Sequence, residues 1–185
     1  GDSNTLIGYL AGDAVTTVSY ITAVGEKALS ANTSGQKNTA VGRAALQSIT
    51  TVNNNTAVGY NCLSGGSNAA SGNTGVGADV LSANTSGANN TGVGLGSLTA
   101  NTTGAENVAV GSEALMTNTT GGLNTAVGTE ALEANTTGQY NTALGGAALK
   151  ANTTASNNTA VGLNCLLTNT TGASNTAVGA TSLDS

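Results

Sequence analysis

The chain contains no histidine, tryptophan, phenylalanine or proline, and four tyrosines are its only aromatic residues. Large apolar side chains fill a conventional core, and this composition cannot build one of useful thickness. Charged residues make up 7% of the sequence, only four residues are basic, and the net charge is −5. Because Lys and Arg on phosphates supply much of nucleic-acid affinity, we expect no nucleic-acid partner.

Residue sets typical of catalysis and metal binding are also missing. Without histidine, the many Ser and Thr hydroxyls have no evident base to activate them. The closest carboxylates, Glu130 and Glu133, are better interpreted as an exposed pair on a helical turn than as an acid/base pair. No recurring Asp ladder matches the calcium-binding solenoid repeats. We therefore expect no enzymatic activity, no cofactor and no metal site.

Targeting and membrane signals are equally scarce. No apolar run is long enough to cross a bilayer, so we expect no membrane insertion. The sequence starts at Gly1 without a recognisable signal peptide, which suggests a processed product or a segment of a longer protein.

What the sequence does contain is one short motif, repeated along its whole length. Asn-Thr-Ala-Val-Gly, as at residues 124–128, recurs in steps of 17 residues with a single step of 18. Such a fixed period indicates a repeat architecture in which each unit stacks on the last. We interpret residues 1–185 as a single repeat domain. The repeats start at Asn4, Ile21, Asn38, Asn55, Asn73, Asn90, Asn107, Asn124, Asn141, Asn158 and Asn175.

Numbered from its Asn, each repeat combines strand and turn signals. Thr-Ala-Val at positions 2–4 favours a β-strand, and Gly at position 5 allows a bend. Asn-Thr-Thr-Gly at positions 12–15 is typical of a turn, with Asn and Gly expected in left-handed conformations. Seventeen residues are too few for paired-helix repeats, although one short helical turn, as at residues 130–133, stays open. The prediction is an all-β parallel β-solenoid (β-roll) of eleven 17-residue coils.

Alternation along the strand predicts which residues face the inside of the coil. Positions 2 and 4 share one side and position 3 takes the other. We expect the apolar residues at positions 4 and 9 to fill the interior as a core ladder. That ladder comprises Val24, Val41, Val58, Val76, Val93, Val110, Val127, Leu144, Val161 and Val178, with Leu29, Leu46, Leu63, Leu81, Leu98, Leu115, Leu132, Leu149 and Leu166.

Position 3 is then expected to point outward, yet it never carries a polar residue. A solvated face would have accumulated polar side chains. We interpret this ladder as an oligomer face, most simply around a three-fold axis. It comprises Ala23, Ala40, Ala57, Gly75, Gly92, Ala109, Ala126, Ala143, Ala160 and Ala177.

The two cysteines, Cys62 and Cys165, both fall at position 8, where most coils carry Ala. Six coils at about 4.8 Å each separate them by roughly 29 Å, far beyond disulfide reach. We expect both to be small buried apolar residues.

The motif Asn-Thr-Ala-Val-Gly-x-x-Ala-Leu resembles the Ser-Val-Ala-Ile-Gly-x-x-Ala-x-Ala repeats of trimeric autotransporter adhesin heads, the YadA-like family. With Asn-Thr-Thr-Gly between copies, it is more similar still to repeat regions of phage tail fibres and related bacterial surface proteins. The resemblance covers residues 4–183. It implies a left-handed parallel β-roll in which three chains pack around an axis.

These patterns lead to one expected function and two alternatives. We expect a non-catalytic fibre module, the shaft or head of an extracellular, cell-surface or virion fibre. Its partners would be itself, as a homotrimer or head-to-tail filament, and a cell-surface or glycan receptor bound through outer residues such as Tyr9, Tyr60 and Tyr140. Because neither end has a clear polar cap, a self-polymerising filament subunit is the first alternative.

The second alternative is an ice-binding solenoid that uses the Thr ladder at position 13 and its neighbours at position 14. The position 13 candidates are Thr33, Thr85, Thr102, Thr119, Thr136, Thr153 and Thr170.

The Asn residues before these threonines form glycosylation sequons. Turn hydrogen bonding is the favoured interpretation of them, and glycosylation is the alternative. The sequon residues are Asn32, Asn84, Asn101, Asn118, Asn135, Asn152 and Asn169.

Overall fold

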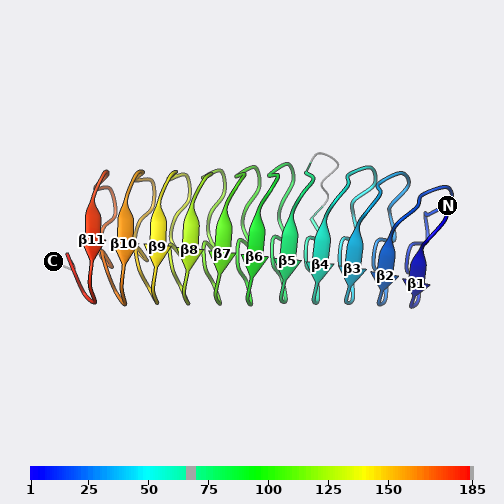
Figure 1. Cartoon of the computed structure of the whole chain (residues 1–185), viewed down its shortest axis with the longest axis horizontal. Coiled ribbons are helices and arrows are strands. Elements are labelled where there is room, and N and C mark those ends of the chain that lie inside the picture. The colour runs from blue at the N-terminus through cyan, green and yellow to red at the C-terminus, as the bar shows by residue number, and fades with distance from the viewer. Residues whose placement is uncertain (66–69, 184–185) are drawn as a thin grey trace.

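Each copy of the motif forms one three-residue strand in the computed structural model, which describes residues 1–65 and 70–183. The strands stand side by side along one axis (Figure 1). They are β1 (Thr5–Ile7), β2 (Thr22–Val24), β3 (Thr39–Val41), β4 (Thr56–Val58), β5 (Thr74–Val76), β6 (Thr91–Val93), β7 (Val108–Val110), β8 (Thr125–Val127), β9 (Thr142–Leu144), β10 (Thr159–Val161) and β11 (Thr176–Val178).

The strands form one parallel sheet in sequence order, β1 to β11, and every pair keeps the same register. Thr125 pairs with Thr142, and Val127 with Leu144. The register holds across the 18-residue step, where Thr56 pairs with Thr74. The extra residue falls between Asn55 and Asn73, and part of that coil, residues 66–69, lies outside the described residues. The prediction of a parallel β-solenoid is confirmed.

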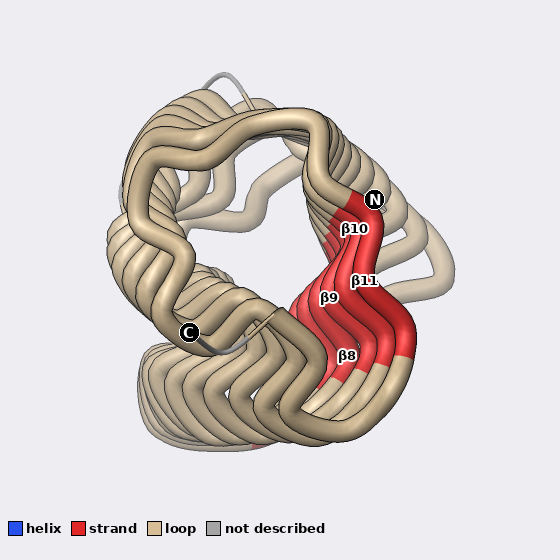
Figure 2. The backbone as a smooth tube through the Cα atoms, turned by 90° about the vertical axis from the view of Figure 1, so that its left-hand side faces the viewer, coloured by secondary structure: helices blue, strands red, loops and turns tan. Residues whose placement is uncertain are grey.

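Viewed along the axis, strands β8 to β11 lie one behind another with a small offset, and loops and turns form the rest of these coils (Figure 2). No helix occurs in residues 1–65 and 70–183, so none there is long and apolar enough to cross a membrane. The alternative of a helical turn at residues 130–133 is wrong, because Glu130 and Leu132 both have left-handed φ values, 59° and 53°.

The left-handed residues are not those expected. Positions 7, 9 and 17 carry φ values near 55°, as at Leu123 (59°), whereas the Asn and Gly of Asn-Thr-Thr-Gly do not. A non-glycine residue costs about 1–2 kcal/mol in this conformation. Burial of a Leu side chain stabilises by about 1.5–3 kcal/mol, which offsets the cost at position 9.

Glycine is required at position 5 by both conformation and space. Gly128 has φ 140°, and a Cβ there would collide with the backbone carbonyl of Gly145 in the next coil. The position 5 glycines stack in this way from Gly25 on Gly42 to Gly162 on Gly179. The side chain is excluded because neighbouring backbones approach so closely here.

The core ladder is confirmed at position 9 and wrong at position 4. The Leu residues at position 9 are almost fully buried in every coil from Leu29 to Leu166. The position 4 side chains point outward instead, as shown by Val58 at 37% exposure and Leu144 at 48%. The correction applies to Val24, Val41, Val58, Val76, Val93, Val110, Val127, Leu144, Val161 and Val178, all half-buried or exposed.

The predicted oligomer face is correspondingly wrong, because position 3 faces the interior of its own coil. Ala126 is fully buried within a single chain. The correction covers Ala23, Ala40, Ala57, Gly75, Gly92, Ala109, Ala126, Ala143, Ala160 and Ala177, all of them buried.

The interior beside the strand is narrow, which is why position 3 is small. A Cβ on Gly92 would lie 2.6 Å from a methyl group of Val80, and a Cβ on Gly75 would meet Cys62 and Val80. Both cysteines and Val80 occupy position 8, across the coil from position 3, and are fully buried. Both glycines thus adjoin Val80, the largest residue at position 8, where close packing leaves no room for a Cβ.

Candidate functional site

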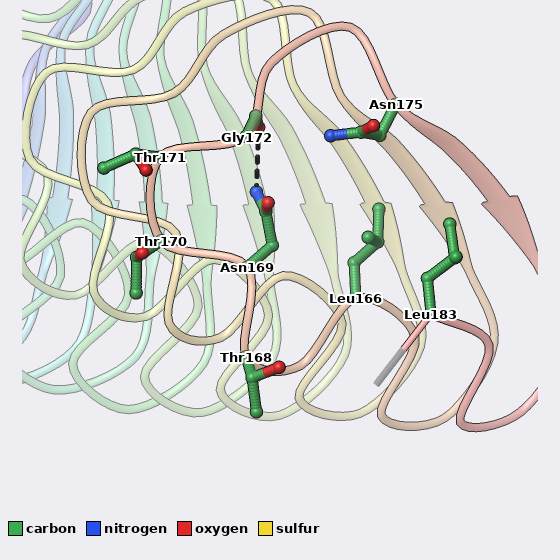
Figure 3. Close-up of a pocket in the computed structure, with 8 residues that line it drawn as sticks. All are labelled: Leu166, Thr168, Asn169, Thr170, Thr171, Gly172, Asn175 and Leu183. Carbon is green, nitrogen blue, oxygen red and sulfur yellow. Dashed lines mark hydrogen bonds between the residues drawn. The ribbon is translucent and has the colours of Figure 1, made fainter. Parts of the chain in front are cut away.

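The half of the interior opposite the strand is polar, and it is built on the Asn of Asn-Thr-Thr-Gly. Figure 3 shows this turn in the last complete copy, where the Asn169 side chain donates to the Gly172 carbonyl at 3.0 Å. In the middle of the stack, the Asn135 amide donates to Gly138 O (3.1 Å) and to Asn118 Oδ1 (2.8 Å). The position 12 side chains therefore form a hydrogen-bonded ladder from coil to coil.

The burial of this ladder argues against the glycosylation hypothesis at six of the seven sequons. Asn32, Asn84, Asn101, Asn118, Asn135 and Asn152 have at most 1% exposure. A sugar-bearing amide would have to leave the interior and abandon its hydrogen bonds. Asn169, in the last copy, is partly exposed, yet its amide is bonded to Asn152 Oδ1 and Gly172 O. The turn interpretation is the one that the geometry favours.

A second Asn ladder begins each repeat at position 1. The Asn124 side chain accepts the backbone N–H of Asn141 (2.9 Å) and donates to the carbonyl of Gly138 (2.9 Å). The carbonyl of Gly138 thus receives one amide from each Asn ladder. Buried amides satisfied in this way stabilise and specify the fold, whereas unpaired ones would be costly.

Two of the first three coils replace part of this network with apolar residues. Ile49 and Val52 occupy the places of Asn and Gly, and both are nearly fully buried. Asn38 nevertheless still donates to the Val52 carbonyl at 2.7 Å. The backbone carbonyl at position 15 therefore still accepts the amide of a position 1 Asn when the side chain at position 15 changes from Gly to Val.

The Thr ladder at position 13 is occupied by structural hydrogen bonds. The hydroxyl of Thr136 donates to the carbonyl of Thr153 at 3.0 Å, and that of Thr119 to the carbonyl of Thr136 at the same distance. Equivalent bonds are made by Thr33, Thr85, Thr102 and Thr153. These hydroxyl protons serve the stack and are not free to orient water outside it.

A different threonine column lies on the outer side of the sheet. Positions 2 and 4 point outward together, so the sheet presents one column of Thr and one of Val; we call this surface the Thr/Val face. Its Thr column comprises Thr5, Thr22, Thr39, Thr56, Thr74, Thr91, Thr125, Thr142, Thr159 and Thr176, with Val108 in the remaining strand. Sequence reasoning overlooked this face, although the near-constancy of Thr at position 2 was its signal.

Among residues 1–65 and 70–183, charged side chains form small ion pairs between neighbouring coils. Lys150 lies 2.7 Å from Glu130 and 3.1 Å from Glu133, and its hydrogen bond to Glu130 and then that to Glu133 raise the pKa of its amine. Arg43 meets Glu26 at 3.3 Å and lies over the ring of Tyr60. These contacts join neighbouring coils at the surface, where such pairs contribute little stability.

Both cysteines are buried and unpaired, as expected. Burial raises the pKa of the Cys62 thiol to about 12, with a backbone hydrogen bond at Val58 acting in the opposite direction. A thiol with so high a pKa is protonated at neutral pH and is a poor nucleophile or metal ligand. Within the described ranges, no group of three or more His, Cys, Asp and Glu side chains could hold a metal ion.

Two hollows of the described surface have identifiable linings. One of about 350 Å³ is lined by Leu166, Asn169 and Leu183 among others, and is the interior of the last coils seen at the end of the stack (Figure 3). Another, beside Lys150, is lined by Ala151 and Leu167. The outer tyrosines Tyr9, Tyr60 and Tyr140 are exposed, but they stand in the first, fourth and eighth coils and form no common patch.

Comparison with known protein families, curated proteins and solved structures gives no significant match. The resemblance to adhesin heads and tail fibres therefore stays a prediction, and function is inferred from the geometry of the chain itself.

Proposed function

We propose that this chain is a non-enzymatic structural module, a stiff rod within an extracellular, cell-surface or virion fibre. The supporting observation is the continuity of its bonding. Backbone hydrogen bonds join every pair of neighbouring strands, and from Asn38 to Asn175 the side-chain oxygen of each position 1 Asn accepts the backbone N–H of the next one. Each coil is held by its neighbours alone, so stiffness extends as far as the repeats do.

Strength along the axis comes from many equivalent small contacts. Eleven strands spaced about 4.8 Å apart give a ladder roughly 50 Å long. Between the coils that start at Asn73 and Asn158, separating two neighbouring coils requires the simultaneous loss of strand hydrogen bonds and two Asn contacts, and it exposes a buried Leu layer. Such a module suits a spacer or shaft that holds a binding tip away from a surface.

A homotrimer remains part of the proposal only through the resemblance to trimeric fibres, because the position 3 ladder no longer supports it. A receptor-binding role through the exposed tyrosines is likewise proposed without support from the position 3 ladder. A self-polymerising filament is the alternative that the test below must separate from a module of fixed length.

The test is negative-stain electron microscopy of the purified chain, combined with analytical ultracentrifugation. We expect rods of one length, with the sedimentation mass giving the number of chains in each rod. Long filaments would favour the polymerising subunit. Round or irregular particles would contradict the proposal.

A matched pair of variants sharpens this test. Asn118→Ala together with Asn135→Ala removes two adjacent steps of the buried ladder and should shorten or disrupt the rods. Thr120→Ala together with Thr137→Ala changes the same two turns at exposed side chains that make no hydrogen bond, and should leave the rods intact.

A further inference from the structure

The Thr/Val face has a composition that strand formation alone does not explain. Outward strand positions favour β-branched residues, but charged and long polar residues are also usual there in a solvated sheet. None of the positions 2 and 4 in the eleven strands carries a charge. The face is uncharged from β1 to β11.

Recent duplication does not account for this uniformity. Position 6, one residue beyond the bend, varies between Tyr60, Arg43, Leu95 and Gly146. Position 17, just before the strand, varies as widely. The coils have therefore diverged on both sides of the Thr/Val face, while the exposed residues of the face itself have stayed nearly constant.

The hydroxyl groups of the face are free, unlike those at position 13. None of the ten Thr side chains at position 2 makes a hydrogen bond in the described structure, and all are half-buried or exposed. Each can donate to and accept from water. Val side chains beside them, such as Val76 at 39% exposure, supply methyl groups that water must surround without bonding.

The spacing of these groups is set by the backbone. In-register pairing places successive Thr hydroxyls about 4.8 Å apart along the axis, and places Thr and Val of one strand about 6.6 Å apart. Thr125 pairs directly with Thr142, and Val127 with Leu144. The axial repeat is close to the repeat of oxygen atoms along the a axis of hexagonal ice. The face is a grid held rigid by the sheet.

We propose that the Thr/Val face binds the surface of ice. Waters held on the Thr hydroxyls and between the methyl groups adopt lattice-like positions and freeze to the crystal. The ordering cost is small because the grid is already rigid, and many weak contacts over ten coils add to firm adsorption. This activity is separate from the rod function and places the site on the sheet instead of the Thr ladder at position 13.

Other ligands fit the face less well. Sugar platforms need aromatic rings, and no position 2 or 4 residue is aromatic. An ionic partner would find no charge on the face. A second copy of the chain could cover the apolar column, and the experiment below treats that as the competing outcome.

The test measures adsorption of the purified chain to ice, by ice-affinity partitioning and by thermal hysteresis. The test variant is Thr125→Lys with Thr142→Lys, at the middle of the face. The control is Thr120→Lys with Thr137→Lys, which adds the same charges to exposed, non-bonding residues at position 14. Circular dichroism of both variants establishes that the solenoid is folded.

We expect the chain and its control variant to enter ice and to show thermal hysteresis. We expect the Thr125/Thr142 variant to lose both, down to the level of a non-binding protein. Thr125→Val with Thr142→Val keeps the methyl groups of the face and removes two hydroxyl groups, so it should retain part of the ice adsorption. This variant provides the comparison if the Lys variant fails to fold.

Two results would overturn the proposal. One is absence of ice adsorption by the unmodified chain. The other is equal adsorption by the Thr125/Thr142 and control Lys variants. If the chain does not adsorb and is an oligomer that the Thr125/Thr142 variant alone dissociates, the face is an interface between copies. Rods in electron microscopy would persist in that case, so the two proposals fail independently.

Discussion

Two columns of threonine run along the solenoid, and they differ in what their hydroxyl groups do. At position 13 the hydroxyl of Thr136 donates to the next coil at 3.0 Å. At position 2 the hydroxyl of Thr125 has no protein partner and faces outward. The same residue type therefore recurs for two reasons: one column holds the stack together, and the other covers its outer sheet.

The same contrast separates the two sides of each coil. On the sheet side, Ala126 and Leu132 form a thin apolar interior. On the turn side, Asn124 and Asn135 form a buried polar interior in which amides meet at the carbonyl of Gly138. A chain with few large apolar residues can build a core because half of that core is held by satisfied amides.

The largest expected effect is at the bend that closes the sheet side. Gly128→Ala should lower the free energy of unfolding by at least about 3 kcal/mol, because it combines a disfavoured φ with a backbone collision. The measurement is urea denaturation followed by circular dichroism. Gly146→Ala is the control, since a Cβ there meets a side-chain methyl of Leu163 at 3.2 Å and no backbone atom closer than 4.0 Å. Similar losses in both variants would contradict the close-approach explanation.

The next effect is on the turn side. Asn135→Ala leaves the buried Asn118 Oδ1 without its donor. It also removes one of the two hydrogen bonds of the Asn152 amide and one of the two at the Gly138 carbonyl. With about 1–3 kcal/mol for each unsatisfied buried group, we expect a loss of roughly 3 kcal/mol in urea denaturation. Thr137→Ala, in the same turn, should change little. A much smaller loss of unfolding free energy for Asn135→Ala would mean that water takes over the hydrogen bonds of the Asn135 side chain.

A third pair of variants tests which strand side is inside. Ala126→Val should cost about 1–3 kcal/mol through overpacking of the narrow interior. Val127→Thr should stay within about 0.5 kcal/mol, as is usual for surface changes. Thermal denaturation of the two purified variants gives the comparison. If Val127→Thr destabilised the protein more than Ala126→Val, position 4 and not position 3 would face the interior.

The smallest expected effect compares the two Thr columns directly. Thr136→Val removes a hydroxyl that donates to a carbonyl and should cost about 0.5–1.5 kcal/mol. Thr125→Val removes a free hydroxyl on a strand and should be neutral or slightly stabilising. Both are measured by urea denaturation under one condition. Equal effects would show that the two columns do not differ in structural role.

The sequence allowed prediction of the period, the parallel strands and the Leu ladder because these depend on spacing alone. A step of 17 residues carries each Leu to the same place in the next coil, as from Leu115 to Leu132. Together with the single 18-residue step, it also carries Cys62 and Cys165 to the same buried position of their coils. These features would be the same for any coil of this length.

Which side of the strand points into the coil could not be predicted from the spacing. Alternation says that positions 2 and 4 share a side, but it does not say which side is inside. Hydrophobicity favoured Val127 over Ala126 for the interior. The choice was wrong because the interior width is set by Leu at position 9 and by the facing residue at position 8, which leave room only for Ala or Gly.

The buried Asn ladders show a related limit. Asn, Thr and Gly in series predict a turn, and a turn is normally exposed. In a stack, each coil covers the next, so Asn101 and Asn118 bond to one another at 2.8 Å instead of to water. Their burial, and the loss of the glycosylation interpretation, follow from stacking and not from any local propensity.

The sequence by itself determined that this protein is a β-solenoid of repeated coils with a Leu ladder, because the repeat period can be read without knowing any contact between residues. The tertiary structure alone decided which residues face inward, which hydroxyls are free, and where the left-handed bends lie. Those outcomes depend on the width of the coil and on the contacts between neighbouring coils. Both are set only when the whole chain is wound.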